Sequence, residues 1–538
     1  MTIPRPLLRP SGATKARLLV IALAAAAVGV AIAESGGSAS AAAPLRLEFV
    51  YSPDTEDLLA PLIERFNRAA VNVRGRSVRV TGRAITSGEA ERMIADGTLK
   101  PAVWGPASSL WGGLLNADVR EEWVPLDNPS IVQSPQVIAM PERTARKLGW
   151  PHRPIGWKDI PNFAANGAFR FAHPNPTTST SGLSAVAAEY YAVTGKLAGL
   201  TIDDVNHARH DVRKIEASIV HYAPTADDLL AQLARYGPAY ASAVVVQETS
   251  VVHFNEQSPW RLVAIYPADG TFMADYPYIV LDGAWVNTDE RAAAHTFGKW
   301  LRAQVTPKAA ARNGYRVAIP GAPVLPPIDP QHGADPSKPD MVLRPPAPDV
   351  LTAIPATWKE DRRLADVVLV IDASASMGQA GKAAKMRRGA QIFLDSLPRR
   401  DRVGLVAFNG RATTVAPLAR LGANEHTLRA GLAGWAPSGG TALYDAIAEG
   451  VRQVAPNGSG RTTALLVITD GKDDRSYLDL EALTPLIRHS GVPIFTIAIG
   501  SAADRDALEK IAAASRGKAF TSSADGVGDV FRDIALYF

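Results

Sequence analysis

The stretch "DVVLVIDASASMGQ", from Asp366 to Gln379, joins an apolar run to closely spaced oxygen-bearing side chains. Asp372 ends the run, and Ser374 and Ser376 follow at alternate positions. A carboxylate and two hydroxyls are hard donors, which suit Mg²⁺, Mn²⁺ or Ca²⁺ better than zinc or copper. Asp and Ser are also ordinary residues at strand ends and helix N-termini, so this stretch alone leaves a plain turn and a metal cradle both open.

Two later segments add the same kind of side chain at equivalent places. Thr441 lies in the Gly-rich segment "PSGGTALYDA", which opens a helical pattern, and Asp470 ends the apolar run "ALLVITD". In an open parallel sheet, ligands bind beyond the carboxyl ends of the strands. We therefore predict one divalent-cation site formed by Asp372, Ser374, Ser376, Thr441 and Asp470. We expect Mg²⁺, with Mn²⁺ and Ca²⁺ as alternatives, because Mg²⁺ keeps waters that a carboxylate from another molecule can replace.

The elements that must position these residues begin after Leu364. Apolar runs such as "DVVLVID", "RVGLVAFNG" and "PIFTIAIG" alternate with amphipathic helical patterns, which predicts a mostly parallel sheet covered by helices on both faces. The first helical pattern has a buried stripe at Met386, Ala390, Phe393 and Leu397. Its other side is predicted to be a solvated basic face, made of Lys382, Lys385, Arg387 and Arg388.

Over about residues 364–538, the chain resembles a von Willebrand factor type A domain with its metal-ion-dependent adhesion site. The D-x-S-x-S signature, the threonine and the second aspartate of that family fall on the five residues named above. The resemblance implies a doubly wound, Rossmann-like α/β fold. It also implies that the hydroxyls contact the metal directly, that one or both aspartates act through water, and that a protein partner's Asp or Glu carboxylate completes the coordination.

The segment from Leu45 to about Pro320 alternates short strands with amphipathic helices, which predicts another α/β domain. It resembles a two-lobed, periplasmic-binding-protein-like extracellular solute-binding protein, above all in "FAHPNPTTSTSGLSAV" and "YPADGTFMADYPYIVL". By that resemblance a small polar or anionic ligand would lie in the cleft between the lobes. The candidate contacts are Ser52, Ser108, Thr180, Ser181 and Tyr276, although each serine could equally be a plain helix cap.

The N-terminus indicates an extracytoplasmic protein. Basic residues precede the apolar stretch from Leu18 to Ala33, and small residues follow it. A cleaved signal peptide and an uncleaved membrane anchor both fit, and either places the remainder outside the cytoplasm, secreted or at the cell surface. We divide the chain into residues 1–43 (signal or anchor), 44–320 (first domain), 321–363 (Pro-rich linker) and 364–538 (second domain).

Composition and motifs argue against several classes of function. The net charge of +4 over 538 residues is small and its basic residues are scattered, so nucleic acid is not implied. The absence of cysteine excludes disulfides, thiolate metal sites and a cysteine nucleophile. The chain contains no H-E-x-x-H, G-x-S-x-G or phosphate-loop motif, so we expect no enzymatic activity.

These observations lead to two hypotheses about function. The first is a binding protein whose type A domain captures an acidic residue of a protein partner through the cation. The alternative is a transport or sensing receptor for a small polar or anionic solute, in which the type A domain serves as a docking module.

Overall fold

The computed structural model describes residues 43–165, 167, 169–259, 261–434, 436–454 and 460–538. The apolar stretch from Leu18 to Ala33, predicted as a signal peptide or anchor, lies outside these ranges. Within them, no helix is both long and apolar enough to cross a bilayer.

The first lobe of the first domain is built on a five-stranded sheet. Its strands are β1 (Leu45–Tyr51), β2 (Asn72–Val73), β3 (Arg76–Ala84), β4 (Val103–Gly105) and β11 (Ile279–Val280). Their order is β11-β4-β1-β3-β2, with β1 central and parallel to β3 and β4. The accompanying helices are α1 (Glu56–Arg68), α2 (Ser87–Ala95), α3 (Leu110–Val119), α10 (Thr288–Gln304) and α11 (Pro307–Ala311).

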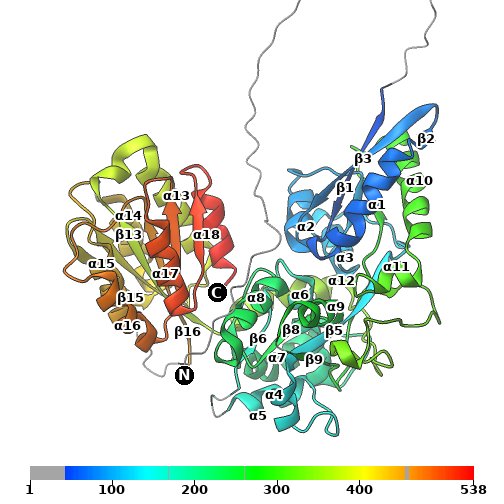
Figure 1. The fold of residues 1–538 in the computed structure, drawn as a ribbon, viewed down its shortest axis with the longest axis horizontal. Coiled ribbons are helices and arrows are strands. Elements are labelled where there is room, and N and C mark those ends of the chain that lie inside the picture. The colour runs from blue at the N-terminus through cyan, green and yellow to red at the C-terminus, as the bar shows by residue number, and fades with distance from the viewer. Residues whose placement is uncertain (1–42, 166, 168, 260, 435, 455–459) are drawn as a thin grey trace, which may run out of the picture. The chain divides into compact units, whose positions relative to one another are not determined.

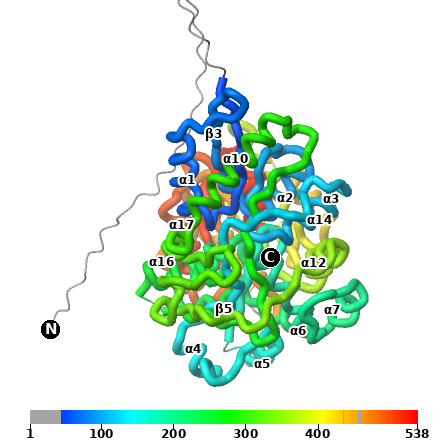
Figure 2. The backbone as a smooth tube through the Cα atoms, turned by 90° about the vertical axis from the view of Figure 1, so that its right-hand side faces the viewer, coloured from blue at the N-terminus to red at the C-terminus, as the bar shows by residue number. Residues whose placement is uncertain are grey.

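The second lobe is built on a separate sheet. Its strands are β5 (Val132–Pro141), β6 (Phe171–Ala172), β7 (Ile219–His221), β8 (Ala243–Gln247), β9 (Leu262–Ile265), β10 (Met273–Ala274) and β12 (Arg316–Val317). The main order is β10-β5-β8-β6-β7, and β9 and β12 also pair with β5. Its helices are α4 (Glu142–Lys147), α5 (Ile160–Ala164), α6 (Thr180–Thr194), α7 (Ile202–Glu216), α8 (Ala226–Tyr236) and α9 (Glu248–Gln257). Figures 1 and 2 both show α1, β3 and α10 at one end of this domain and α4 and α5 at the other.

A helix follows the Pro-rich segment and packs on the second lobe. This helix, α12 (Pro348–Asp361), starts with a proline, which is favoured there because the first helical N–H has no partner within the helix. Its buried side chains Val350, Ile354 and Trp358 belong to the core formed around α6 and α7. Its last residue, Asp361, is buried and forms ion pairs with Arg209 and Arg213 of α7.

The second domain contains one six-stranded sheet. Its strands are β13 (Ala365–Asp372), β14 (Arg402–Phe408), β15 (Ala412–Arg420), β16 (Thr462–Thr469), β17 (Ile494–Ile499) and β18 (Ala519–Ser522). The order is β15-β14-β13-β16-β17-β18, and only the edge pairing of β14 with β15 is antiparallel. All eight residues of β13 are buried, as expected for a central strand covered on both faces.

Helices cover both faces of this sheet, as Figure 1 shows. Side chains alternate along β13: Val367, Leu369 and Ile371 join one core, whereas Val368 and Val370 join the other. The first core is closed by α13 (Lys382–Ser396), α14 (Leu421–Gly434) and α18 (Val527–Ala535). The second is closed by α15 (Leu443–Val454), α16 (Leu480–Ser490) and α17 (Arg505–Ser515). The predicted α/β class, with a two-lobed first domain and a mostly parallel second sheet, is confirmed.

Candidate functional site

The strand order of the second domain creates a crevice beside β13. The chain runs outward from β13 through β14 to β15, and then returns to the other side of β13 as β16. The connections after β13 and after β16 therefore leave the sheet in opposite directions, and ligands of doubly wound sheets bind at such a switch point. Asp372 is the last residue of β13, and Asp470 directly follows β16.

Four of the five predicted metal ligands are linked one to the next by hydrogen bonds at this crevice. Ser374 Oγ lies 3.0 Å from Ser376 Oγ, and Ser376 Oγ donates a hydrogen bond of 2.6 Å to Asp470 Oδ1. Asp372 Oδ1 accepts a 2.8 Å hydrogen bond from the Ser374 N–H. Both aspartates are fully buried and Ser376 is half-buried, so the group opens to the surface at Ser376.

The fifth residue, Thr441, is brought to the same place by a Gly-rich loop. Ser438 N–H donates to Ala373 O at 2.9 Å, and Ala375 N–H donates to Gly439 O at 3.2 Å, so this loop is tied to the segment after β13. A Cβ atom added at Gly471 would lie 3.4 Å from Thr441 Oγ1 and 4.0 Å from Ser376 Oγ. The glycine after Asp470 thus leaves a space that hydroxyls from two different loops face.

The Asp372 carboxylate is held by donors on both of its oxygens. In addition to the bond from Ser374, Oδ2 accepts a 2.5 Å hydrogen bond from the hydroxyl of Thr469, the last residue of β16. Burial raises the pKa of Asp372 and the nearby charge of Asp470 adds to this, whereas the hydrogen bonds from Ser374 and Thr469 lower it. Two buried carboxylates side by side attract positive charge to the crevice.

Lys382 supplies part of that positive charge, which contradicts its prediction as a residue of a solvated face. Its ammonium forms an ion pair with Asp470 Oδ2, and its side chain is only 18% exposed. A signal was present in the sequence: Lys382 is the first residue of α13, and a cation at a helix N-terminus is unfavourable unless an anion lies nearby. Sequence reasoning missed this contact because helical spacing alone assigned the residue to the outer face.

Acidic residues that follow β16 and open α15 hold the loops around the crevice in place. Asp474 Oδ1 accepts a 2.6 Å hydrogen bond from the Thr441 N–H. Asp445 accepts from the N–H groups of Tyr477 and Leu478, at 3.0 and 3.1 Å. These carboxylates therefore position the loop that carries Thr441 and the loop that follows Asp470.

A second candidate site is the cleft between the lobes of the first domain. It is a cavity of about 70 Å³. The lining residues are Ser52, Pro53, Asp54, Thr86, Ser87, Ala107, Thr178, Ser179, Thr180, Ser181, Thr225, Ala226, Asp227, Gln247 and Ser250. Three of the five predicted contacts, Ser52, Thr180 and Ser181, are among them.

The other two predicted contacts do not line the cleft. Ser108 is buried and its hydroxyl accepts a 3.3 Å hydrogen bond from the N–H of Leu110, at the start of α3. Tyr276 is also buried, and its hydroxyl donates to Asp54 Oδ2 from the interior of the first lobe. Ser108 therefore serves the helix, and Tyr276 supports a lining residue from behind.

Two carboxylates that the sequence analysis did not single out face this cleft. Asp54 Oδ1 is buried and has no hydrogen-bond partner among the described residues. Burial raises the pKa of Asp54, against hydrogen bonds that lower it, and burial together with the charge of Asp54 raises the pKa of Asp227. The lining contains neither lysine nor arginine. The cleft is therefore suited to a polar or cationic group rather than to an anion.

Comparisons with known proteins match the same two regions. A family described as "von Willebrand factor type A domain" matches residues 366–532, and one described as "Bacterial extracellular solute-binding protein" matches residues 47–316.

An uncharacterized protein of Mycobacterium tuberculosis is 24% identical over 514 residues, covering 87% of this chain and 73% of the relative. Calcium-activated chloride channel regulator 4 of Homo sapiens is 30% identical over 172 residues, covering 31% of this chain and 18% of that protein. The solved structure of a periplasmic thiamin binding protein is similar over 60% of this chain and 98% of its own, with 13% identity and a TM-score of 0.43.

Both resemblances noted in the sequence are confirmed by these matches. The solute-binding match alone spans residues 47–316, which is half of the 538 residues. The type A match begins at Asp366, inside β13, and contains all five predicted metal ligands. The chain therefore belongs to the bacterial extracellular solute-binding protein family and carries a von Willebrand factor type A domain behind its solute-binding domain.

Proposed function

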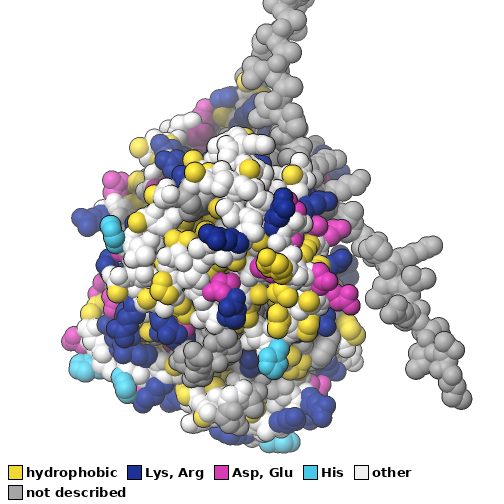
Figure 3. Space-filling model, turned by 90° about the vertical axis from the view of Figure 1, so that its left-hand side faces the viewer, with side chains coloured by type: hydrophobic (Ala, Val, Ile, Leu, Met, Phe, Trp, Pro, Cys, Tyr) yellow, Lys and Arg dark blue, Asp and Glu magenta, His cyan; other side chains and the backbone are white. Residues whose placement is uncertain are grey.

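We propose that this protein is a non-catalytic, extracytoplasmic binding protein whose type A domain captures an acidic protein partner through a divalent cation. The observation that carries the proposal is the convergence of two buried carboxylates and three hydroxyls at the switch point of the sheet. The membership of the first domain in an extracellular family supports the location. On the face drawn in Figure 3, basic side chains are scattered among acidic and uncharged ones, which supports a protein partner rather than nucleic acid.

The proposed division of labour follows from the charges at the crevice. Ser374, Ser376 and Thr441 would offer hydroxyl oxygens, while Asp372 and Asp470 would supply the negative charge, directly or through water. Mg²⁺ prefers six oxygen ligands and usually keeps several of them as waters. Its positive charge would therefore be only partly neutralised by the protein, and a carboxylate of the partner could replace one of the waters. Because Ser376 is half-buried whereas the other four predicted ligands are buried, the partner's carboxylate would approach from the side of Ser376.

The function is tested by capture of a partner from the cell envelope. Full-length chain immobilised on beads is expected to retain at least one envelope protein in the presence of Mg²⁺ and to release it when a chelator is added. Protein retained equally with and without the chelator would contradict the proposal. A partner so identified should lose binding when its contacting Asp or Glu is changed to Asn or Gln.

Tyr477 is expected to be a contact residue for the partner. It is fully exposed on the loop that follows Asp470, and its backbone N–H is fixed by Asp445. Exposed tyrosines on ordered loops are frequent hot spots of protein interfaces, so Tyr477→Ala should weaken capture by about tenfold. Mg²⁺ affinity, measured by calorimetry, should stay unchanged. Leu126→Ala, at a fully exposed apolar residue of the other domain, serves as the control and should leave capture intact.

A second candidate function is reception of a small solute in the interlobe cleft, and Asp54 and Asp227 favour a cationic or polar solute for it. The cavity of about 70 Å³ is smaller than the roughly 300–1,000 Å³ typical of small-molecule pockets. A solute would therefore enter only when the two lobes are further apart, and hinge closure would then bring them together around it.

The pH dependence of solute binding distinguishes cationic from anionic ligands. Because the pKa values of Asp54 and Asp227 are raised above the ordinary 3.8, both carboxyls lose their protons at a higher pH than an ordinary aspartate does. The affinity for an organic cation should therefore rise as pH increases through these raised pKa values, and the rise should be smaller in Asp227→Asn. The pH dependence is measured as the rise in unfolding temperature that small organic cations, or carboxylic acids, produce at each pH. Asp211→Asn, which changes an exposed aspartate of α7, is the control and should behave like the wild type. Stabilisation by the acids alone would contradict the assignment.

A further inference from the structure

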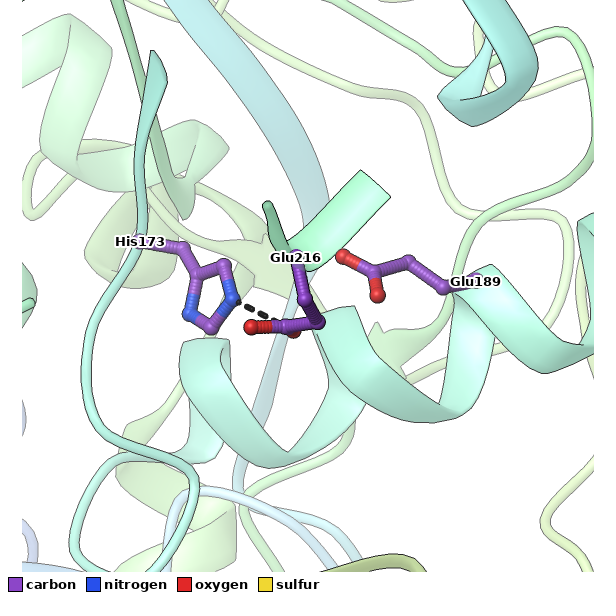
Figure 4. Close-up of side chains that lie close together, drawn as sticks. All are labelled: His173, Glu189 and Glu216. Atoms are coloured by element: carbon purple, nitrogen blue, oxygen red, sulfur yellow. Dashed lines mark hydrogen bonds and ion pairs between the residues drawn. The ribbon is translucent and has the colours of Figure 1, made fainter. Parts of the chain in front are cut away.

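Three ionisable side chains meet in the interior of the second lobe. His173 directly follows β6, Glu189 lies within α6, and Glu216 ends α7. All three are completely buried. One potential ligand atom of each lies within 4.8 Å of the other two, and Figure 4 shows the three side chains directed toward one another. Buried glutamates without a counter-charge are rare, so the cluster requires an explanation.

The hydrogen bonds of His173 and Glu216 fix which atoms face each other. His173 Nδ1–H donates to Pro174 O at 2.8 Å, so in the neutral ring Nε2 carries the lone pair. Nε2 lies 3.0 Å from Glu216 Oε1. The other oxygen of Glu216 accepts hydrogen bonds from Tyr222 (2.6 Å) and from Trp358 Nε1 (3.0 Å), which favours the ionised carboxylate. His173 Nε2 and Glu216 Oε1 would then both present lone pairs at a separation of 3.0 Å, and these repel each other unless a positive species lies between them.

Glu189 decides what kind of positive species fits. Both of its carboxylate oxygens are buried and have no hydrogen-bond partner among the described residues. A proton on His173 would satisfy only the contact with Glu216, and a further proton on Glu189 would still leave one of its two buried oxygens without a partner. A divalent cation would be neutralised by the two carboxylates and would satisfy all three side chains.

We infer that His173, Glu189 and Glu216 form a buried site for a divalent transition-metal cation, of the chemical class represented by Zn²⁺. One imidazole nitrogen and two carboxylates are a donor set that zinc accepts, whereas Mg²⁺ prefers oxygen ligands alone. The backbone carbonyl that accepts from Nδ1 and the two donors on Glu216 orient the ligands, as outer partners do in known metal sites. Ligand atoms of a tetrahedral zinc site lie about 3.3 Å apart, so Glu189 needs only a small side-chain movement.

The position of the site indicates a structural role. Its ligands join the end of β6 to α6 and α7, and Trp358 connects Glu216 to α12. A cation here would fasten the helix that precedes the type A domain to the second lobe. Because all three ligands are fully buried, the metal would enter during folding and would resist chelators that remove metal from the accessible crevice of the type A domain.

Metal content of the full-length chain tests the inference. Protein is purified from cells supplied with zinc, treated with a chelator under native conditions, and analysed by mass spectrometry of the metal. We expect about one chelator-resistant zinc per chain in the wild type and in Asp372→Ala. The Glu189→Gln and His173→Gln variants should retain at least tenfold less. Glu91→Gln removes the charge of another buried glutamate, in α2, and should keep the zinc.

Chelator-resistant metal that is lost from Asp372→Ala would assign it to the type A domain instead and overturn the inference. A wild-type chain without chelator-resistant zinc would also overturn it, even if the Glu189→Gln variant fails to fold. In that case the cluster holds protons only, and the wild type should unfold at the same temperature whether or not zinc was supplied during growth. With the metal site, zinc-starved protein should unfold at a lower temperature.

Discussion

Asp372→Ala is expected to abolish divalent-cation binding by the type A domain and, with it, capture of the partner. The carboxylate ends a central strand and is held by Ser374 and Thr469, so its removal leaves the remaining hydroxyls with half of the negative charge. Changes to outer partners alone reduce metal affinity by about 10- to 100-fold, and the loss here should be at least about 100-fold. Titration of the full-length chain with Mg²⁺ and Mn²⁺ by calorimetry measures it, followed by the envelope capture experiment.

The matched control is Asp366→Asn. Asp366 is a buried aspartate near the other end of the same strand, where it forms ion pairs with Arg402 and Arg461. Its replacement should lower the free energy of unfolding and leave metal affinity unchanged. If Asp372→Ala still binds Mg²⁺ like the wild type, or if capture survives in this variant and in the presence of a chelator, the metal-dependent function is wrong.

Lys382→Met is expected to act in the opposite direction on metal affinity. The ammonium of Lys382 neutralises Asp470, so an incoming cation must displace it or share the carboxylate with it. Without this competitor, Mg²⁺ affinity should increase on the order of tenfold, which corresponds to about 1.4 kcal/mol. In the absence of metal the same variant should be less stable, by about 3 kcal/mol, the low end for a broken buried ion pair, because a buried carboxylate loses its partly exposed counter-charge. Metal should therefore raise the unfolding temperature more in the variant than in the wild type.

Lys385→Met provides the control for Lys382. It lies one turn further along α13 and pairs with the exposed Asp525, a surface contact that contributes little to stability. Its replacement should change neither Mg²⁺ affinity nor unfolding temperature appreciably. If Lys382→Met binds Mg²⁺ with the same affinity as the wild type, the ammonium of Lys382 does not compete with the metal for Asp470, and this prediction is wrong.

The fold of the second domain could be predicted because its strands are continuous apolar runs. Runs such as the one ending at Asp372 can only be buried on both faces, and this requires helices on both sides of a parallel sheet. The helix α12 was missed within the segment predicted as a Pro-rich linker. Pro355 stands in its interior, where proline normally interrupts a helix, and tertiary contacts of Trp358 and Asp361 outweigh that preference.

The candidate sites could be predicted only where the residues stand at strand ends. Position in the sequence was enough to bring Asp372, Ser376 and Asp470 together, because carboxyl ends of neighbouring parallel strands meet. It was not enough for Lys382, or for Asp54 and Asp227, whose partners come from distant elements. The cluster at His173 was likewise hidden, because its three members come from different elements, β6, α6 and α7, or directly follow them.

The short connection between α12 and β13 has a mechanical consequence. Asp361 ends α12, and β13 begins four residues later at Ala365. A partner held at Ser374 and Ser376 would pull β13 along its length, against hydrogen bonds to both β14 and β16 that share the load in shear. The force would then pass to the ion pairs of Asp361 with α7. Tension on a captured partner would thus be borne by the centre of the sheet and delivered to the second lobe through α12, beside direct contacts such as that of Lys518 with Asp228.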